Sequence, residues 1–302
     1  MSNTDKNTLN TSCKQQARVM LWSAPRCLST AFERSIMQLD NSKVYNEFYT
    51  AAYFFGPHRV WAREFMPLAP HLSRERVKTK LESEHSEAQV IFAKDFAFTL
   101  QGRHDMIPEG FTHTFLIRDP MKMFTSLKPR LEASRLSRAV VGTDLMKCIQ
   151  SKGYAIKEMY DLFEYLRQHN ITPIVLDADD LLEDPEGMMR KYCQHTGIPF
   201  DEKMMSWEPK KMTQMTWHCA KVMRLANWLM GWYNGALNST QFQKPSTPRE
   251  IDFDTLSEDV RTAIDVTTPY YRYLYEFRLR PDTASSPVVA DALENISQEK
   301  LI

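Results

Sequence analysis

Three features of the sequence predict an α/β fold built on one parallel β-sheet. Short apolar runs, typical of buried strands, recur along the first two thirds of the chain. Segments with helical periodicity separate these runs, and strands that alternate with helices form βαβ units. The third feature is composition, since 43% of the residues are hydrophobic, which is ample for a core on both faces of a sheet. We therefore expect a parallel sheet flanked by helices.

The expected elements alternate in order along the chain. Strands are predicted over five apolar runs: 19–22, 44–47, 90–93, 114–117 and 173–176. Helices are predicted between them, over 30–38, 74–88, 121–134 and 144–167. Beyond Leu176 the pattern becomes mostly helical. Pro185 suits the first position of a helix and Gly197 its C-terminal cap, and further helices are expected over 217–229 and 258–277.

The chain is expected to form one domain with polar ends. Residues 1–16 and 281–302 are polar and are predicted to be tails, the first of them disordered, around an α/β domain spanning 17–280. Lys plus Arg and Asp plus Glu both number 38 among the 302 residues, so the formal net charge is zero. A neutral chain has no overall field that would draw it to nucleic acid or to an anionic membrane, and neither is expected as a partner.

The cysteines and the N-terminus indicate a cytoplasmic protein without a structural metal. The five cysteines are scattered and contain no C-x-x-C pair, which predicts free thiols and neither disulfides nor zinc: Cys13, Cys27, Cys148, Cys193 and Cys219. The N-terminus lacks the apolar stretch of a signal peptide, and no segment has the roughly eighteen uncharged residues of a membrane span. The sequence leaves the oligomeric state open, a homodimer included.

The most informative segment is VMLWSAPRCLSTAFERSI, residues 19–36. An apolar strand breaks at Ser23-Ala24-Pro25, and a cation and two hydroxyls, Arg26, Ser29 and Thr30, follow where a helix begins. A helix N-terminus offers unpaired N–H groups and a partial positive charge, which favour phosphate and sulfate groups. The segment predicts an anion site.

The loop differs from two better-known phosphate cradles. It has neither the two glycines nor the lysine of a Walker A motif. A phosphatase cradle needs an arginine six positions after its cysteine, but Arg34 follows Cys27 by seven. The alternative interpretation is an ordinary helix that Ser29 or Thr30 caps.

A second candidate for the anion site follows the strand over 114–117. That strand ends in Arg118-Asp119-Pro120, and Ser126 comes eight positions after Arg118. Ligands of parallel sheets bind at the carboxyl ends of the strands, so Arg118 is expected at the same edge as the 23–30 loop. The guanidinium fork of arginine can make two parallel hydrogen bonds to a phosphate. The alternative is an arginine that pairs with Asp119 or Asp177.

Together these residues resemble the sulfotransferase superfamily, in its soluble plant, invertebrate and bacterial branch. The resemblance rests on three segments: the SAPR-x-x-ST loop, R-D-P-x5-S, and VLDADDLLEDPEGMMRKYCQHTGIPFDEKMMSWEP over 175–209. The resemblance implies a P-loop-like sulfotransferase fold with a helical C-terminal half. It also implies transfer of a sulfuryl group from 3′-phosphoadenosine 5′-phosphosulfate (PAPS) without a metal. The loop would bind the 5′-phosphosulfate, and Arg118 and Ser126 the 3′-phosphate. The implied loop residues are Arg26, Cys27, Leu28, Ser29 and Thr30.

The loop departs from the family's common Pro-Lys-x-Gly-Thr-Thr pattern at two positions. Arg26 stands at the lysine position and keeps its positive charge, and Leu28 stands at the glycine position, where it limits close backbone approach. Arg26 is expected to stabilise the charge that develops on the bridging oxygen during transfer.

The resemblance also suggests a general base. In several relatives a glutamate just after the second strand has this role, and here that position is Glu47 in VYNEF. Lys94 and Asp95 are expected to line the same catalytic site. The alternative is that Glu47 only pairs with a local cation such as Arg26.

The predicted function is a PAPS-dependent sulfotransferase that acts on a hydroxyl or amine of a small-molecule acceptor. Two alternatives remain open: a nucleotide-binding P-loop phosphotransferase, and a module of the same fold that binds the cofactor without catalysis. Aromatic segments at 49–55 and 217–233 hint at an apolar or aromatic acceptor.

Overall fold

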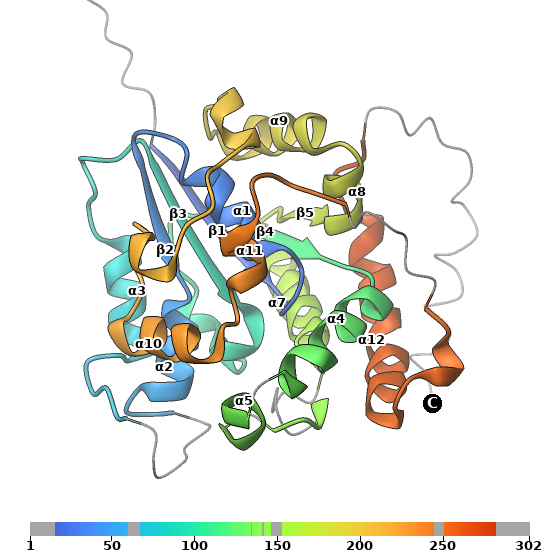
Figure 1. Ribbon diagram of the computed structural model, residues 1–302. Coiled ribbons are helices and arrows are strands. Elements are labelled where there is room, and N and C mark those ends of the chain that lie inside the picture. The colour runs from blue at the N-terminus through green and yellow to red at the C-terminus, as the bar shows by residue number, and fades with distance from the viewer. Residues whose placement is uncertain are drawn as a thin grey trace, which may run out of the picture.

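A five-stranded parallel sheet forms the centre of the molecule (Figure 1). The structure, a computed structural model, describes residues 16–59, 67–133, 135–140, 142–145, 153–244 and 251–281. The strand order is β2-β3-β1-β4-β5, and each neighbouring pair is parallel. The strands are β1 Ala17–Ser23, β2 Ser42–Asn46, β3 Val90–Phe96, β4 Thr112–Ile117 and β5 Ile174–Asp177. The predicted α/β fold with a parallel sheet is confirmed, and all five strands lie where the apolar runs placed them.

Helices cover both faces of this sheet (Figure 1). On one face lie α1 (Ser29–Ile36) and α9 (Pro185–Thr196), whose rings Phe32 and Tyr192 meet edge to face with centroids 4.9 Å apart. On the other face lie α2 (Phe48–Phe55), α7 (Ile156–Gln168) and α12 (Glu258–Glu276). Covering both faces explains why the strands are apolar along their whole length.

The remaining helices complete the two layers and the carboxyl edge of the sheet. α3 (Arg74–Glu82) packs on α2, and α4 (Pro120–Glu132) packs on α12. α10 (Lys221–Met230) and α11 (Asn234–Asn238) form the orange segment of Figure 1. The other described elements are α5 Arg135–Val140 and α8 Ala178–Glu183, with short 3₁₀ turns at Ala97–Leu100, His104–Met106, Glu202–Met205, Met212–Gln214 and Phe253–Thr255.

Several predicted helix boundaries shift in the structure. The helix predicted over 217–229 begins only at Lys221, because Trp217 and His218 run beside β2, where the His218 N–H donates to the Val44 carbonyl (2.7 Å). The helix predicted over 144–167 is described from Ile156 onward, and residues 146–152 lie outside the described part. Pro185 and Gly197 take the predicted first-turn and left-handed cap positions. The predicted tails lie outside the described residues, except for Gln16 and Pro281.

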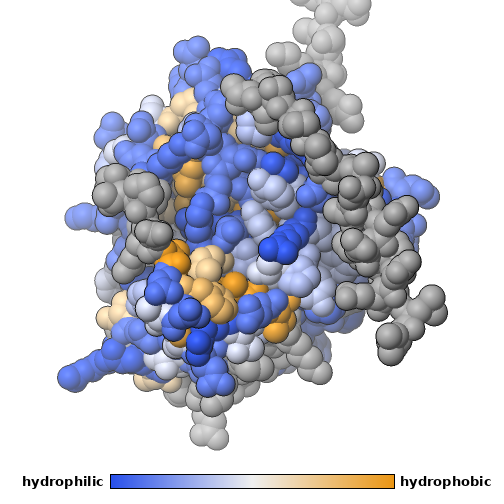
Figure 2. All heavy atoms as spheres, turned by 90° about the vertical axis from the view of Figure 1, so that its right-hand side faces the viewer, coloured by the Kyte–Doolittle hydropathy of each residue, from blue (hydrophilic) through white to orange (hydrophobic). Residues whose placement is uncertain are grey.

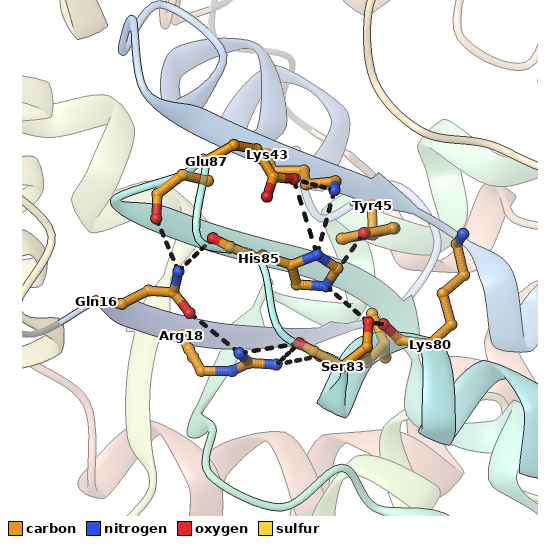
Figure 3. Close-up of polar contacts among 10 residues, drawn as sticks. Gln16, Arg18, Lys43, Tyr45, Lys80, Ser83, His85 and Glu87 are labelled. Atoms are coloured by element: carbon orange, nitrogen blue, oxygen red, sulfur yellow. Dashed lines mark hydrogen bonds and ion pairs between the residues drawn. The ribbon is translucent and has the colours of Figure 1, made fainter.

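Gln16 belongs to a polar network at the start of the sheet (Figure 3). Its amide donates to the carbonyls of His85 (2.8 Å) and Ala88 (2.7 Å), and the Arg18 guanidinium donates to its oxygen (3.0 Å). The ring of His85 lies between the Lys43 ammonium (3.2 Å) and the Tyr45 hydroxyl (3.3 Å). This network joins the amino ends of β1 and β2 to the connection that precedes β3.

The face that lies on the right of Figure 1 is mostly hydrophilic, with its hydrophobic residues gathered mainly toward the lower left of Figure 2. Among the described residues, no helix combines the length and apolar character that crossing a bilayer requires.

Candidate functional site

The loop between β1 and α1 ends in a helix start with free N–H groups. α1 begins at Ser29 without any side-chain cap, so neither Ser29 nor Thr30 acts as the ordinary cap considered above. The residue before it, Leu28, has a left-handed backbone (φ 65°), and so does Arg26 (φ 68°). Leu28 thus adopts the conformation that a glycine would favour at this position. An uncapped helix N-terminus is suited to an anion.

Arg118 and Ser126 meet this loop directly. The Arg26 Nε donates to the Ser126 Oγ at 3.1 Å, and an Arg118 Nη donates to the Arg26 carbonyl at 2.7 Å. α4 carries Ser126 and begins at Pro120. Asp119 caps that helix through the N–H of Lys122 (3.3 Å). The fold therefore brings together residues that lie about a hundred positions apart in the chain.

This cluster has an excess of positive charge. Burial lowers the pKa of Arg26, and the neighbouring charges of Arg118 and Arg130 lower it further. No carboxylate of the described residues forms an ion pair with any of the three guanidinium groups. The Arg118 Nε is buried and has no hydrogen-bond partner in the described part of the molecule. Buried donors are normally satisfied, so an unpaired one beside a helix N-terminus fits an anionic group that is held there.

A second cluster lies at the ends of β2 and β3. Glu47 and Lys94 form a buried ion pair, with side chains 3% and 1% exposed. Asn46 donates to both carboxylate oxygens of Glu33 (3.0 and 2.9 Å), a residue of α1. Burial raises the pKa of Glu33 well above its ordinary value, and the charge of Glu47 adds to that rise. The cation that Glu47 meets is therefore Lys94 rather than Arg26.

Asp95 lies on the other face of β3, although its charge still interacts with those of Glu47 and Lys94. Successive residues of a strand point to opposite faces, so Lys94 faces α1 while Asp95 faces α2. The Asp95 carboxylate accepts hydrogen bonds from the N–H groups of Tyr49 (2.6 Å) and Thr50 (2.9 Å) and from the Thr50 hydroxyl (2.6 Å). These hydrogen bonds attach the Asp95 carboxylate to the start of α2. Burial raises the pKa of Asp95 to about 7. The expectation that Asp95 lines the catalytic site stays a prediction, and the hydrogen bonds of its carboxylate go to the start of α2.

Cys27 lies inside the loop and is fully buried. Burial raises the pKa of its thiol to about 12, while the charges of Arg118 and Lys94 act in the opposite direction. The residue packs with the Met123 sulfur at 3.9 Å. Cys27 therefore packs as a buried, uncharged side chain between the two clusters, and its part in cofactor binding stays a prediction.

We expect the Cys27 thiol to resist alkylation in the folded protein, because little thiolate exists at pH 8 and the side chain is enclosed. Treatment with iodoacetamide, followed by mass spectrometry of the Cys27 peptide, should show an unmodified residue. The same treatment in denaturant should modify it completely. Rapid labelling of the native protein would contradict this placement.

Four side chains near the two clusters were not singled out from the sequence. They are Glu33 and Arg34 on α1, Arg130 on α4, and Tyr233 before α11. Glu33 and Arg34 are charged residues on a helix whose other positions are nearly all buried, and a charge at a buried helical position was the signal available. The contacts of Arg130 and Tyr233 depend on the path of the chain after Trp217.

Residues 149–273 match a family model described as "Sulfotransferase domain". The matched range excludes the 23–30 loop, Arg118 and Ser126, so it is evidence from a different part of the chain. The resemblance to the sulfotransferase superfamily is confirmed. A sulfotransferase domain supports a sulfotransferase activity for this chain.

Two solved structures and two curated relatives resemble the chain. The "Sulfotransferase Domain from the Synechococcus PCC 7002 Olefin Synthase" is 10% identical, with a TM-score of 0.43 over 85% of this chain and 96% of that one. The "Sulfotransferase Domain from the Curacin Biosynthetic Pathway" is 8% identical, with a TM-score of 0.41 over 95% and 98%. "Branched-chain-amino-acid aminotransferase-like protein 2" and "protein 1" of Arabidopsis thaliana are 26% and 24% identical over 74% of this chain. The chain spans only 36% of the length of each plant relative, so both relatives are much longer proteins.

Within the described residues, no group of three or more histidine, cysteine or acidic side chains is arranged to hold a metal ion.

Proposed function

We propose that this sulfotransferase transfers a sulfuryl group from PAPS to a hydroxyl or amine of a small-molecule acceptor. The observation that carries the proposal is the meeting of Arg26, Arg118 and Ser126 at the uncapped N-terminus of α1. The buried Nε of Arg118, which has no partner among the described residues, is the polar atom that best fits a bound anion. Three guanidinium groups, none of them paired with a described carboxylate, favour a ligand with more than one phosphate or sulfate group.

Different residues of this site would hold different parts of such a cofactor. The N–H groups at the start of α1, with Ser29 and Thr30, would hold the 5′-phosphosulfate. Arg118 and Ser126 would hold the 3′-phosphate, because the Ser126 oxygen accepts from Arg26 and its hydroxyl proton remains to be donated. Arg26, with its guanidinium beside the loop, would stabilise charge as the bridging oxygen departs.

Glu47 is the proposed general base. It would accept the proton of the acceptor hydroxyl as the acceptor oxygen bonds to sulfur and the bond from sulfur to the bridging oxygen breaks. Lys94, paired with it, positions the carboxylate at the edge of the sheet. Asp95 is proposed only as the residue that anchors α2, immediately after Glu47.

Calorimetric titration tests the cofactor assignment. We expect 3′-phosphoadenosine 5′-phosphate (PAP) to bind at least tenfold more tightly than ATP or adenosine 5′-phosphosulfate, since both of these lack the 3′-phosphate that Arg118 would hold. Equal affinities for the three nucleotides would refute the proposed 3′-phosphate site. Tight binding of ATP with Mg²⁺ would favour the phosphotransferase alternative.

Substitution Glu47→Gln tests the base. The amide cannot accept the proton, so we expect turnover to fall by roughly 10²–10⁴-fold. The affinity for PAP should remain unchanged, because Glu47 lies outside the proposed phosphate contacts. The measurement is PAP release from PAPS with the best acceptor of a panel of phenols, alcohols and amines. Glu84→Gln, at an exposed position, is the matched control. Near-normal turnover of the Glu47→Gln variant would show that another group accepts the proton.

A further inference from the structure

A cavity of about 590 Å³ lies between the segment 209–214 and helices α10 and α11. Its size suits a small molecule. Among the described residues that line it, two lysines, Lys210 and Lys211, are charged and none is an Asp or Glu. The described residues offer neither lysine an ion-pair partner within 4 Å. The charge of the cavity is therefore positive, and its lining is otherwise mixed, with Trp228 and Tyr233 of the aromatic 217–233 segment among its walls.

The cavity also has an unsatisfied hydrogen-bond donor. Asn227 of α10 lines it and is 5% exposed. The Asn227 Nδ2 finds no hydrogen-bond partner in the described part of the structure. An unpaired buried amide is costly unless another molecule supplies an acceptor. A carboxylate oxygen would satisfy it and would at the same time neutralise a lysine.

Tyr233 connects the cavity to the proposed base. Its side chain is among those that line the cavity, and its hydroxyl reaches the Asn46 Oδ1 at 3.4 Å. Burial raises the pKa of Tyr233 well above its ordinary value, and the neighbouring charge of Glu47 raises it further. The cavity and the Glu47–Lys94 pair thus share one side chain.

A buried guanidinium holds two walls of the cavity together. Arg34 of α1 is 1% exposed and donates to the carbonyls of Leu237 (2.9 Å) and Ser239 (3.0 Å). Its other terminal nitrogen donates to the carbonyl of Glu208, just before the 209–214 segment. Carbonyls at the C-terminal end of α11 are suitable partners for a cation. The cavity is therefore anchored to the helix that carries the proposed donor site, which favours a preformed binding site.

We propose that this cavity binds the anionic, non-reacting end of the acceptor, so that the acceptor is a hydroxylated small molecule bearing a carboxylate. The inference rests on the proposed function and adds the class of acceptor to it. Lys210 and Lys211 bind the carboxylate, and Asn227 donates a hydrogen bond to it. The acceptor hydroxyl then extends past Tyr233 toward Glu47, which takes its proton as the new bond to sulfur forms and the bond to the bridging oxygen breaks.

The test is a binding screen followed by kinetics. Saturation-transfer NMR in the presence of PAP would compare hydroxylated carboxylic acids with their neutral amides, for example 4-hydroxyphenylacetate with 4-hydroxyphenylacetamide. We expect acids to bind at least tenfold more tightly than the matched amides. In the Lys210→Gln/Lys211→Gln double variant this preference should disappear. For an acid that the wild-type protein also sulfates, the double variant should have a higher KM for that acid and a kcat that is little changed.

Controls separate this inference from the proposed function. Lys203→Gln removes an exposed lysine, paired with Asp40, that does not line the cavity, and it should leave acid binding unchanged. Asn227→Leu should weaken acids more than amides while the protein stays folded by circular dichroism. If PAP fails to bind the wild-type protein, the proposed function fails. If PAP binds but acids bind no more tightly than their amides, the inference about the cavity is overturned and the cofactor site stands. The same holds if the acids bind without displacing a phenol that the protein sulfates.

Discussion

Arg118→Ala is expected to abolish tight binding of PAP. The substitution removes the guanidinium fork proposed for the 3′-phosphate, including the buried Nε that has no partner among the described residues. Two charge-assisted hydrogen bonds together contribute roughly 3 kcal/mol or more, which corresponds to a loss of affinity of about 100-fold or greater. ATP, which lacks the 3′-phosphate, should bind the variant and the wild-type protein with similar, weak affinity.

Two further variants make this experiment decisive. Arg118→Lys keeps the charge without the fork, so we expect affinity for PAP between that of the wild type and that of Arg118→Ala. Arg103→Ala removes an exposed arginine that pairs with Asp105 and should change neither affinity nor folding. Arg118 also donates to the Arg26 carbonyl, so thermal unfolding of each variant should be recorded beside the calorimetry. PAP binding that survives in Arg118→Ala would place the 3′-phosphate elsewhere.

Lys94→Met is expected to destabilise the protein by about 3–5 kcal/mol. It leaves the Glu47 carboxylate buried without its cation, beside Glu33, and an unpaired buried charge is far more costly than a missing pair. The double variant Lys94→Met/Glu47→Gln removes both charges, so it should recover most of that loss. Chemical denaturation of the two single variants and the double variant measures the difference.

An exposed ion pair provides the comparison for the buried one. Lys203→Met breaks the surface pair with Asp40, whose side chains are 61% and 83% exposed, and should cost no more than about 1 kcal/mol. If Lys94→Met and the double variant are equally stable, the buried pair does not exist in solution as described. If Lys94→Met is as stable as wild type, Glu47 is compensated by another group.

The strands, and the placement of Arg118 and the 23–30 loop at one edge of the sheet, could be predicted because their signals are local. Five apolar runs gave five strands, and Pro120 and Pro185 each mark the first turn of a helix. The meeting of Arg118 with the 23–30 loop followed from the rule that ligands of parallel sheets bind at the carboxyl ends of strands. The hydrogen bond from Arg118 to the Arg26 carbonyl was not itself predicted and comes from the structure.

Lys94 and Asp95 show what local reasoning left out. Adjacent residues of a strand point to opposite faces of the sheet, and this alternation could have been applied to the sequence itself. The acidic residue caps α2, a helix that was not predicted because its aromatic residues lack a polar face. The cavity was beyond prediction, since its walls come from separate segments that meet through Arg34 and through a backbone hydrogen bond from Lys210 to Leu237.

The left-handed residues of the 23–30 loop bear on the thermodynamics of the anion binding proposed for it. A loop rich in glycine samples many conformations and loses them when an anion arrives, whereas Pro25, Arg26 and Leu28 restrict the chain before any ligand binds. The strain of two left-handed side chains is incurred once, during folding, and is balanced by the packing of Cys27 and Leu28 against the core. The consequence is a smaller entropic penalty on binding than a glycine loop would carry, and Leu28→Gly would increase that penalty even though it removes strain.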